Sequence, residues 1–99
     1  MKHIVESACP EHMKKYLPGP TGRNLSQLTP GEYAKILFYA SLGKTAGQIR
    51  GILGGQVSIV AIRGLVGGRS LAIEAMKELS LIEKMEFCAA VRNKLLSRE

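Results

Sequence analysis

The residues best suited to chemistry in this chain are cations gathered in its middle. Between Glu32 and Glu74 the sequence contains no acidic residue. The basic residues of this stretch are Lys35, Lys44, Arg50, Arg63 and Arg69. The formal net charge of the chain is +6, so this stretch carries nearly all of the excess. A concentrated positive field favours a polyanionic partner, such as a nucleic acid or an anionic membrane surface, and a solvated basic surface is the plainer alternative.

Groups that could support catalysis or hold a metal are sparse. Cys9 and His12, with His3 nearby, are three possible soft ligands, but a structural zinc site needs four ligands in close pairs. As a nucleophile and base, Cys9 and His12 lack an orienting acid on a rigid element. The chain contains no Asp, which argues against magnesium or calcium, and it has no nucleophile elbow or phosphate loop. We therefore expect no enzyme, no catalytic residue, no metal and no cofactor.

Composition limits the class of protein and of nucleic acid. The chain has 99 residues, enough for one domain, and its 45% hydrophobic and 22% charged residues are typical of a globular protein. Aromatic residues make up 5% with no Trp, which argues against single-strand or RNA recognition by base stacking and favours double-stranded DNA.

The location expected for the chain follows from its cysteines and its hydropathy. Cys9 and Cys88 lie far apart, and the N-terminus lacks the apolar region of a secretory signal. Both cysteines are therefore expected to be reduced thiols in a cytoplasmic protein. No apolar run approaches the roughly 18 residues of a membrane span.

A phrase of eight residues occurs twice in the basic stretch. Residues 49–56, IRGILGGQ, return as residues 62–69, IRGLVGGR. Each copy surrounds one arginine with branched apolar residues and closes with Gly-Gly, which predicts a short helix that ends at a left-handed glycine. Such a pair of short helices is typical of a helix-turn-helix or a small bundle, and a duplicated packing element without a ligand is the alternative.

Helix starts are marked by three capping boxes, which begin at Thr29, Thr45 and Ser80. With Ser58 as a further N-cap, the expected helices are 30–42, one from Thr45 to Leu53, 59–66, 71–79 and 81–97. The box at Ser80 predicts a break between the last two, which could otherwise form one continuous helix.

The N-terminal part is expected to be peripheral. Pro10 suits a short helix through Leu17, and Pro18-Gly19-Pro20-Thr21-Gly22 cannot continue a regular element. We thus expect residues 1–24 to be a loosely packed, flexible arm and linker, and residues 25–99 to form the helical domain. The predicted fold is all-α, a compact bundle of four to five short helices that contains a helix-turn-helix.

Two stretches of the chain resemble known families. Leu28-Thr29-Pro30-Gly31-Glu32, then Gly43-Lys44-Thr45, then Ile49, Leu53 and Val60 resemble the DNA-binding domain of LuxR/GerE-type regulators over residues 28–66. That family's pattern opens Leu-Thr-Pro-x-Glu and continues through Gly-Lys-Ser/Thr to an Ile, a Leu and a Val, and the resemblance implies a four-helix DNA-binding domain. The helix at its recognition position, 58–63, is more apolar here and offers mainly Arg63 to base edges.

The second resemblance begins later in the chain. Leu65-Val66-Gly67-Gly68-Arg69-Ser70 is similar to the Gly-Gly-x-Ser stretch that opens the helix-turn-helix of PapB-type fimbrial regulators. It implies that 71–79 positions and 81–97 reads the DNA, with Arg92, Asn93, Lys94 and Arg98 as polar contacts. Both resemblances imply a bacterial, phage or plasmid regulator, and they differ in the helix that touches DNA.

The last predicted helix carries a wide apolar band, wider than a domain of this size needs to cover. We expect part of it to pair two copies, because two-fold operator half-sites require two reading heads, although packing on the first helix is the alternative. The candidate dimer residues are Ile82, Met85, Ala89 and Leu95.

The function expected from the sequence is a sequence-specific, dimeric regulator that binds double-stranded DNA. The candidate DNA contacts are Lys44, Thr45, Gln48, Arg50, Arg63 and Arg69. One alternative is a small helical module that binds a protein partner without touching DNA, since Gly47, Gly51 and Gly55 at four-residue spacing suit close helix packing. Another is a membrane-surface binder with a cationic amphipathic stretch.

Overall fold

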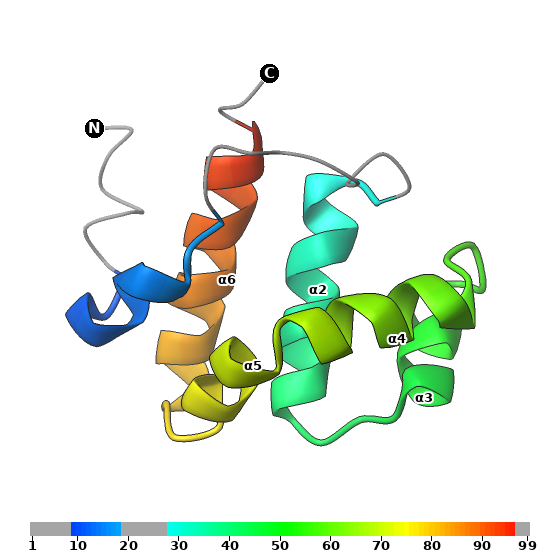
Figure 1. The fold of residues 1–99 in the computed structure, drawn as a ribbon, viewed down its shortest axis with the longest axis horizontal. Coiled ribbons are helices and arrows are strands. Elements are labelled where there is room, and N and C mark those ends of the chain that lie inside the picture. Colours follow the sequence, from blue (N-terminus) through cyan, green and yellow to red (C-terminus); the bar gives the residue numbers. More distant parts are fainter. Residues whose placement is uncertain (1–8, 19–27, 97–99) are drawn as a thin grey trace.

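The computed structural model describes residues 9–18 and 28–96, and the regular elements within these ranges are all helical. A short 3-10 helix precedes the α-helices (Figure 1). The elements are η1 (Glu11–Tyr16), α2 (Pro30–Ser41), α3 (Ala46–Ile52), α4 (Ile59–Gly68), α5 (Ser70–Met76) and α6 (Leu81–Leu96). The predicted all-α helical bundle is confirmed.

Helix starts follow the capping residues of the sequence. At α2, the Thr29 hydroxyl accepts the Glu32 amide N–H at 3.1 Å, and the Glu32 carboxylate accepts the Thr29 N–H at 3.0 Å. Ser80 and Glu83 form the same reciprocal pair at the start of α6, with N–H to oxygen distances of 3.2 and 3.0 Å. Because these bonds satisfy amides that no helical carbonyl can reach, they fix where each helix begins. The predicted break at Ser80 is confirmed.

The central element is α2, which contacts each of the other four α-helices of the described segments (Figure 1). Its buried side chains are Tyr33, Ala34, Ile36, Leu37, Ala40 and Ser41. In Figure 1, α6 lies on one side of α2 and α3 on the other, and α4 runs from α3 across α2 to α5. The surfaces of α6 and α3 are therefore separated by α2.

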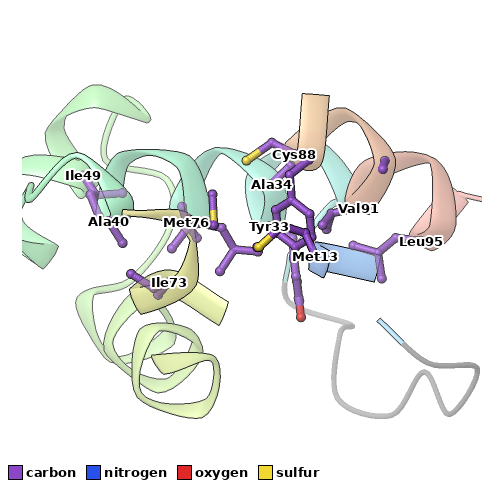
Figure 2. Close-up of a cluster of buried hydrophobic side chains, with 14 of the residues drawn as sticks. Met13, Tyr33, Ala34, Ala40, Ile49, Ile73, Met76, Cys88, Val91 and Leu95 are labelled. Carbon is purple, nitrogen blue, oxygen red and sulfur yellow. The ribbon is translucent and has the colours of Figure 1, made fainter. Parts of the chain in front are cut away.

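The N-terminal segment is part of the core over the residues described. Met13 in η1 is fully buried in the main hydrophobic cluster (Figure 2). Cys9, which is 3% exposed, belongs to the same cluster. Pro18 is also buried. The prediction of a loosely packed arm is therefore wrong for residues 9–18, because η1 packs on α5 and supplies an apolar side chain that the sequence pattern did not assign to the core. The rest of the predicted arm, residues 1–8 and 19–24, lies outside the described residues.

The two Gly-Gly pairs of the repeat have different conformations. Gly54 and Gly55 have φ angles of 84° and 79°, and they end α3 as predicted. Gly67 and Gly68 instead remain inside α4, which continues to Gly68 rather than ending at 66. The chain bends next at Arg69, with φ −119°, and enters α5 directly. The second predicted stop is wrong because glycine permits a left-handed turn without requiring one.

This difference predicts opposite effects of alanine at the two pairs. Gly54→Ala and Gly55→Ala should each lower the free energy of unfolding by about 1 kcal/mol or more, because a Cβ is strained at positive φ. Gly67→Ala and Gly68→Ala should each raise it by about 0.5–1 kcal/mol, since a Cβ there meets nothing within 4 Å. Urea unfolding of the four variants checks this, and a loss at Gly67 equal to that at Gly54 would contradict the helical assignment.

Burial of η1 predicts that its core side chain contributes to stability. Met13→Ala should lower the free energy of unfolding by about 2–4 kcal/mol, because it leaves a cavity in the main core. The neighbouring exposed His12 provides the control, since His12→Ala should change the unfolding midpoint little. Equal midpoints for the two variants would show that η1 does not pack on the core in solution.

Candidate nucleic-acid interface

The turn into α3 carries three of the predicted contact residues. Gly43, with φ 87°, allows the chain to reverse after α2, and Lys44 follows it as an exposed side chain. Thr45 and Gln48 cap α3 reciprocally: the Thr45 hydroxyl accepts the Gln48 N–H at 3.2 Å, and Gln48 Oε1 accepts the Thr45 N–H at 2.9 Å. Their acceptor oxygens are thus used by the helix start, whereas the Thr45 hydroxyl proton and the Gln48 amide protons take no part in these bonds.

The repeated phrase places a buried isoleucine directly before an exposed arginine. Ile49 and Ile62 are both fully buried, and Arg50 and Arg63, one residue later, are exposed. Because α3 and α4 pack against each other, each copy of the phrase anchors its helix with one side chain and presents a cation with the next. The repeat is therefore a packing unit and a charge-presenting unit at once.

Carboxylates do not neutralise these cations in the part of the chain that is described. The ion pairs found among residues 9–18 and 28–96 join Lys14 with Glu11 at 3.3 Å and Lys77 with Glu74 at 3.1 Å. Neither pair involves Lys44, Arg50 or Arg63, whose side chains point to solvent and can reach phosphate oxygens.

Arg69 differs from the other predicted cationic contacts. It is half-buried at the α4–α5 junction, and its Nε donates a hydrogen bond of 2.7 Å to the Tyr33 hydroxyl. The Tyr33 ring belongs to the core of α2, with 2% of the residue exposed. Arg69 therefore ties the bend between α4 and α5 to the central helix, which is a structural role that the sequence did not indicate.

The outer face of α4 is formed by residues that the sequence analysis did not select. Ile62 points into the core, so the helical period places residues 60, 64 and 67 on the opposite side. Val60 there is 79% exposed, and Gly64 and Gly67 are also exposed. Branched apolar residues are usually buried, and the signal that could have placed Val60 outside was its helical phase relative to Ile62.

The predicted dimer residues divide between two faces of α6. Ile82 and Met85 are 67% and 55% exposed, and Ala89 is half-buried on the same outer side. Leu96, 46% exposed, extends this strip by two turns. Leu95 is 4% exposed and lies in the main core, so its assignment as a dimer contact is wrong. We call Ile82, Met85, Ala89 and Leu96 the outer strip of α6. The wide apolar band is thus two faces, one packed inward and one open.

Two titratable side chains of α6, Lys84 and Cys88, are buried in the fold. Lys84 is 8% exposed, and its Nζ donates a hydrogen bond of 2.7 Å to the Leu79 carbonyl oxygen in the turn before α6. Burial raises the pKa of the Cys88 thiol to about 12. At neutral pH this thiol is protonated, and it is therefore a poor nucleophile and a poor metal ligand.

The Cys9–His12 pair is not arranged as a site. Cys9 is buried whereas His12 is exposed. Among residues 9–18 and 28–96, no three His, Cys, Asp or Glu side chains are grouped so that they could hold a metal ion. None of the helices in these segments is long and apolar enough to cross a membrane.

Comparison of the chain with protein-family models, with curated proteins and with solved structures found no match. What the surface can bind must therefore be inferred from its own geometry. It offers an exposed cationic pair on two packed helices, an open face on α4, and a separate apolar strip on α6.

The division of α6 into two faces predicts distinct effects of substitution. Leu95→Ala should lower the free energy of unfolding by about 2–4 kcal/mol, because Leu95 is a core residue. Met85→Ala, which truncates a side chain of the outer strip, should change stability by less than about 0.5 kcal/mol at concentrations where the chain is monomeric. Thermal unfolding of both variants checks this, and a larger loss for Met85 would place the core on the other face of α6.

Proposed function

We propose that the protein is a sequence-specific transcription regulator of bacterial, phage or plasmid origin that binds double-stranded DNA through α3 and α4. The observation that carries the proposal is the repeated unit, in which a buried isoleucine is followed by an exposed arginine on each of two packed helices. These cations lie in a stretch without carboxylates, where a polyphosphate finds attraction and no repulsion.

The arrangement of α2, α3 and α4 suits this role. Short turns join three helices, and α2 supports the other two from the core side. This agrees with the resemblance of residues 28–66 to LuxR/GerE-type domains, in which the third helix lies at the recognition position. Arg50 on α3 and Lys44 before it would hold the phosphate backbone, while α4 would approach the groove.

A homodimer would complete the regulator. The outer strip of α6 is the candidate for pairing, with Leu95 removed from the residues first expected and Leu96 added. Since α3 and α6 lie on opposite sides of α2, pairing through this strip would leave the α3 surface open in both chains (Figure 1). Two phosphate contacts per chain, from Lys44 and Arg50, would give a dimer a slope of log affinity against log salt of about −4.

The experiment that tests this proposal removes the two arginines of the repeat. The double variant Arg50→Ala, Arg63→Ala should bind every duplex more weakly, and its salt slope should be less steep by about 2 in a dimer, because the phosphate contact of Arg50 is lost in each chain. Affinity for a random-sequence duplex is measured by fluorescence anisotropy at several salt concentrations, with light scattering on the same samples for oligomeric state. Circular dichroism should show an unchanged fold, since both side chains are exposed.

The matched control removes the same charge elsewhere. Lys15→Ala, Lys77→Ala changes two exposed cations outside α3, α4 and α6 and should keep most of the affinity and slope of the unmodified protein. Equal losses in the two double variants would show that net charge, and not the α3–α4 surface, governs binding. Absence of duplex binding by the unmodified protein at low salt would overturn the proposal.

A second candidate function is supported by the apolar exposure of the same region. Val60 and Leu71 are 79% and 75% exposed, and Gly64 and Gly67 leave the backbone of α4 uncovered. A helix of a protein partner could pack closely there, as small residues permit. Under this alternative the protein is an interaction module, and the cations only speed the encounter with an acidic partner.

A further inference from the structure

The most exposed branched side chain of α4 is unexplained by the fold. Val60 is 79% exposed, whereas Ile62 two residues later is fully buried. Valine is a poor choice for an exposed helix position, because its branched Cβ restricts rotamers and its methyl groups gain nothing in water. Its position near the N-terminal end of α4 therefore points to a contact outside the chain.

Arg63 lies one turn further along α4 than Val60. Residues three apart on a helix have Cβ atoms about 5–6 Å from each other and share a face. Arg63 is exposed, and the ion pairs found in the described segments do not involve it. The two side chains together offer one apolar and one forked, hydrogen-bond-donating group within a short distance.

The rest of this face carries no side chains. Gly64 and Gly67 are exposed, and a Cβ added to either would meet nothing within 4 Å. Internal packing therefore does not require glycine at these positions, although each costs a helix about 1 kcal/mol relative to alanine. Because glycine has no side chain, the backbone of this face can approach a surface closely. Val60 and Arg63 are then the side chains that extend from it.

The surrounding charge favours one occupant for this face. Lys44 and Arg50 lie on the adjoining turn and helix, and no acidic residue occurs between Glu32 and Glu74. The major groove of B-DNA, about 12 Å wide, admits an α-helix and is lined on both sides by phosphates. A flat apolar protein surface would satisfy Val60 but would leave Arg63 without a counter-charge.

We propose that α4 enters the major groove and that Val60 packs on the C5 methyl group of a thymine while Arg63 donates to O6 and N7 of a guanine. This inference rests on the proposed function and adds to it the base content of the site. The major groove exposes the thymine methyl and the guanine acceptors, and these are the groups that an apolar and a guanidinium side chain recognise. With base pairs about 3.4 Å apart, the Cβ spacing places the two bases within one or two steps.

The experiment begins by selecting preferred duplexes from a random-sequence pool with the unmodified protein. In the selected duplex each thymine is then replaced in turn by uracil, which lacks only the C5 methyl group. We expect one thymine to be sensitive, and it should lie one or two base pairs from a guanine. Its replacement should weaken binding about fourfold, which corresponds to the loss of one buried methyl group. The same replacement should have no effect on Val60→Ala, because that protein has already lost the contact.

The guanine contact is tested in the same way. Replacing that guanine by 7-deazaguanine removes the N7 acceptor and should weaken binding by the unmodified protein about tenfold. Arg63→Ala should bind the two duplexes almost equally, because that protein has already lost the donor to the guanine. Leu71→Ala is the matched control, because it removes an equally exposed apolar side chain from α5 and should keep both base preferences.

Base reading by Val60 and DNA binding by the protein can fail separately. Duplex binding in which no uracil replacement matters, or in which Val60→Ala keeps the methyl effect, would overturn the reading by Val60 and leave the regulator proposal standing. Failure of the protein to bind any duplex would overturn both. Loss of the uracil effect in Val60→Ala together with its retention in Leu71→Ala supports the inference.

Discussion

The structure depends on the burial of the broad apolar face of one central helix, α2. Tyr33, Ala34, Ile36, Leu37 and Ala40 of α2 are all buried, and the helix is enclosed by α3, α4, α5 and α6 (Figure 1). A central helix with so broad an apolar face packs against several helices at once, and α3 and α6 lie on opposite sides of it. The exposed cations of α3 are thereby kept apart from the outer strip of α6.

Local chemistry made most helix boundaries predictable. Capping residues act within four positions of themselves, so Thr29, Thr45, Ser58 and Ser80 could be recognised from the sequence, and each lies at a helix start in the structure. The same reasoning failed at Gly67-Gly68, which repeats the dipeptide Gly54-Gly55 in another conformation. A Gly-Gly pair has no fixed conformation, so the path of the chain after it decides whether the helix ends there.

The features that could not be predicted depend on contacts between residues far apart in the sequence. The role of Arg69 depends on Tyr33, which is 36 positions earlier, and the role of Leu95 depends on which side of α6 meets α2. Burial of Met13 likewise depends on contact between η1 and α5. The exposed cations Lys44, Arg50 and Arg63 were predictable because exposure of charge is the default, whereas the exposure of Val60 contradicts the default for its type.

The glycines of α4 affect the dynamics of the helix as well as its surface. Gly64, Gly67 and Gly68 give up more backbone entropy on folding than other residues, and their open surroundings provide no compensating contacts. Local opening with a small free energy should therefore concentrate in the second half of α4, where amide hydrogens exchange before those of α2. A ligand that binds only the closed helix would slow this exchange and raise the melting temperature in proportion to its occupancy. The ligand would then stabilise the same helix that it contacts.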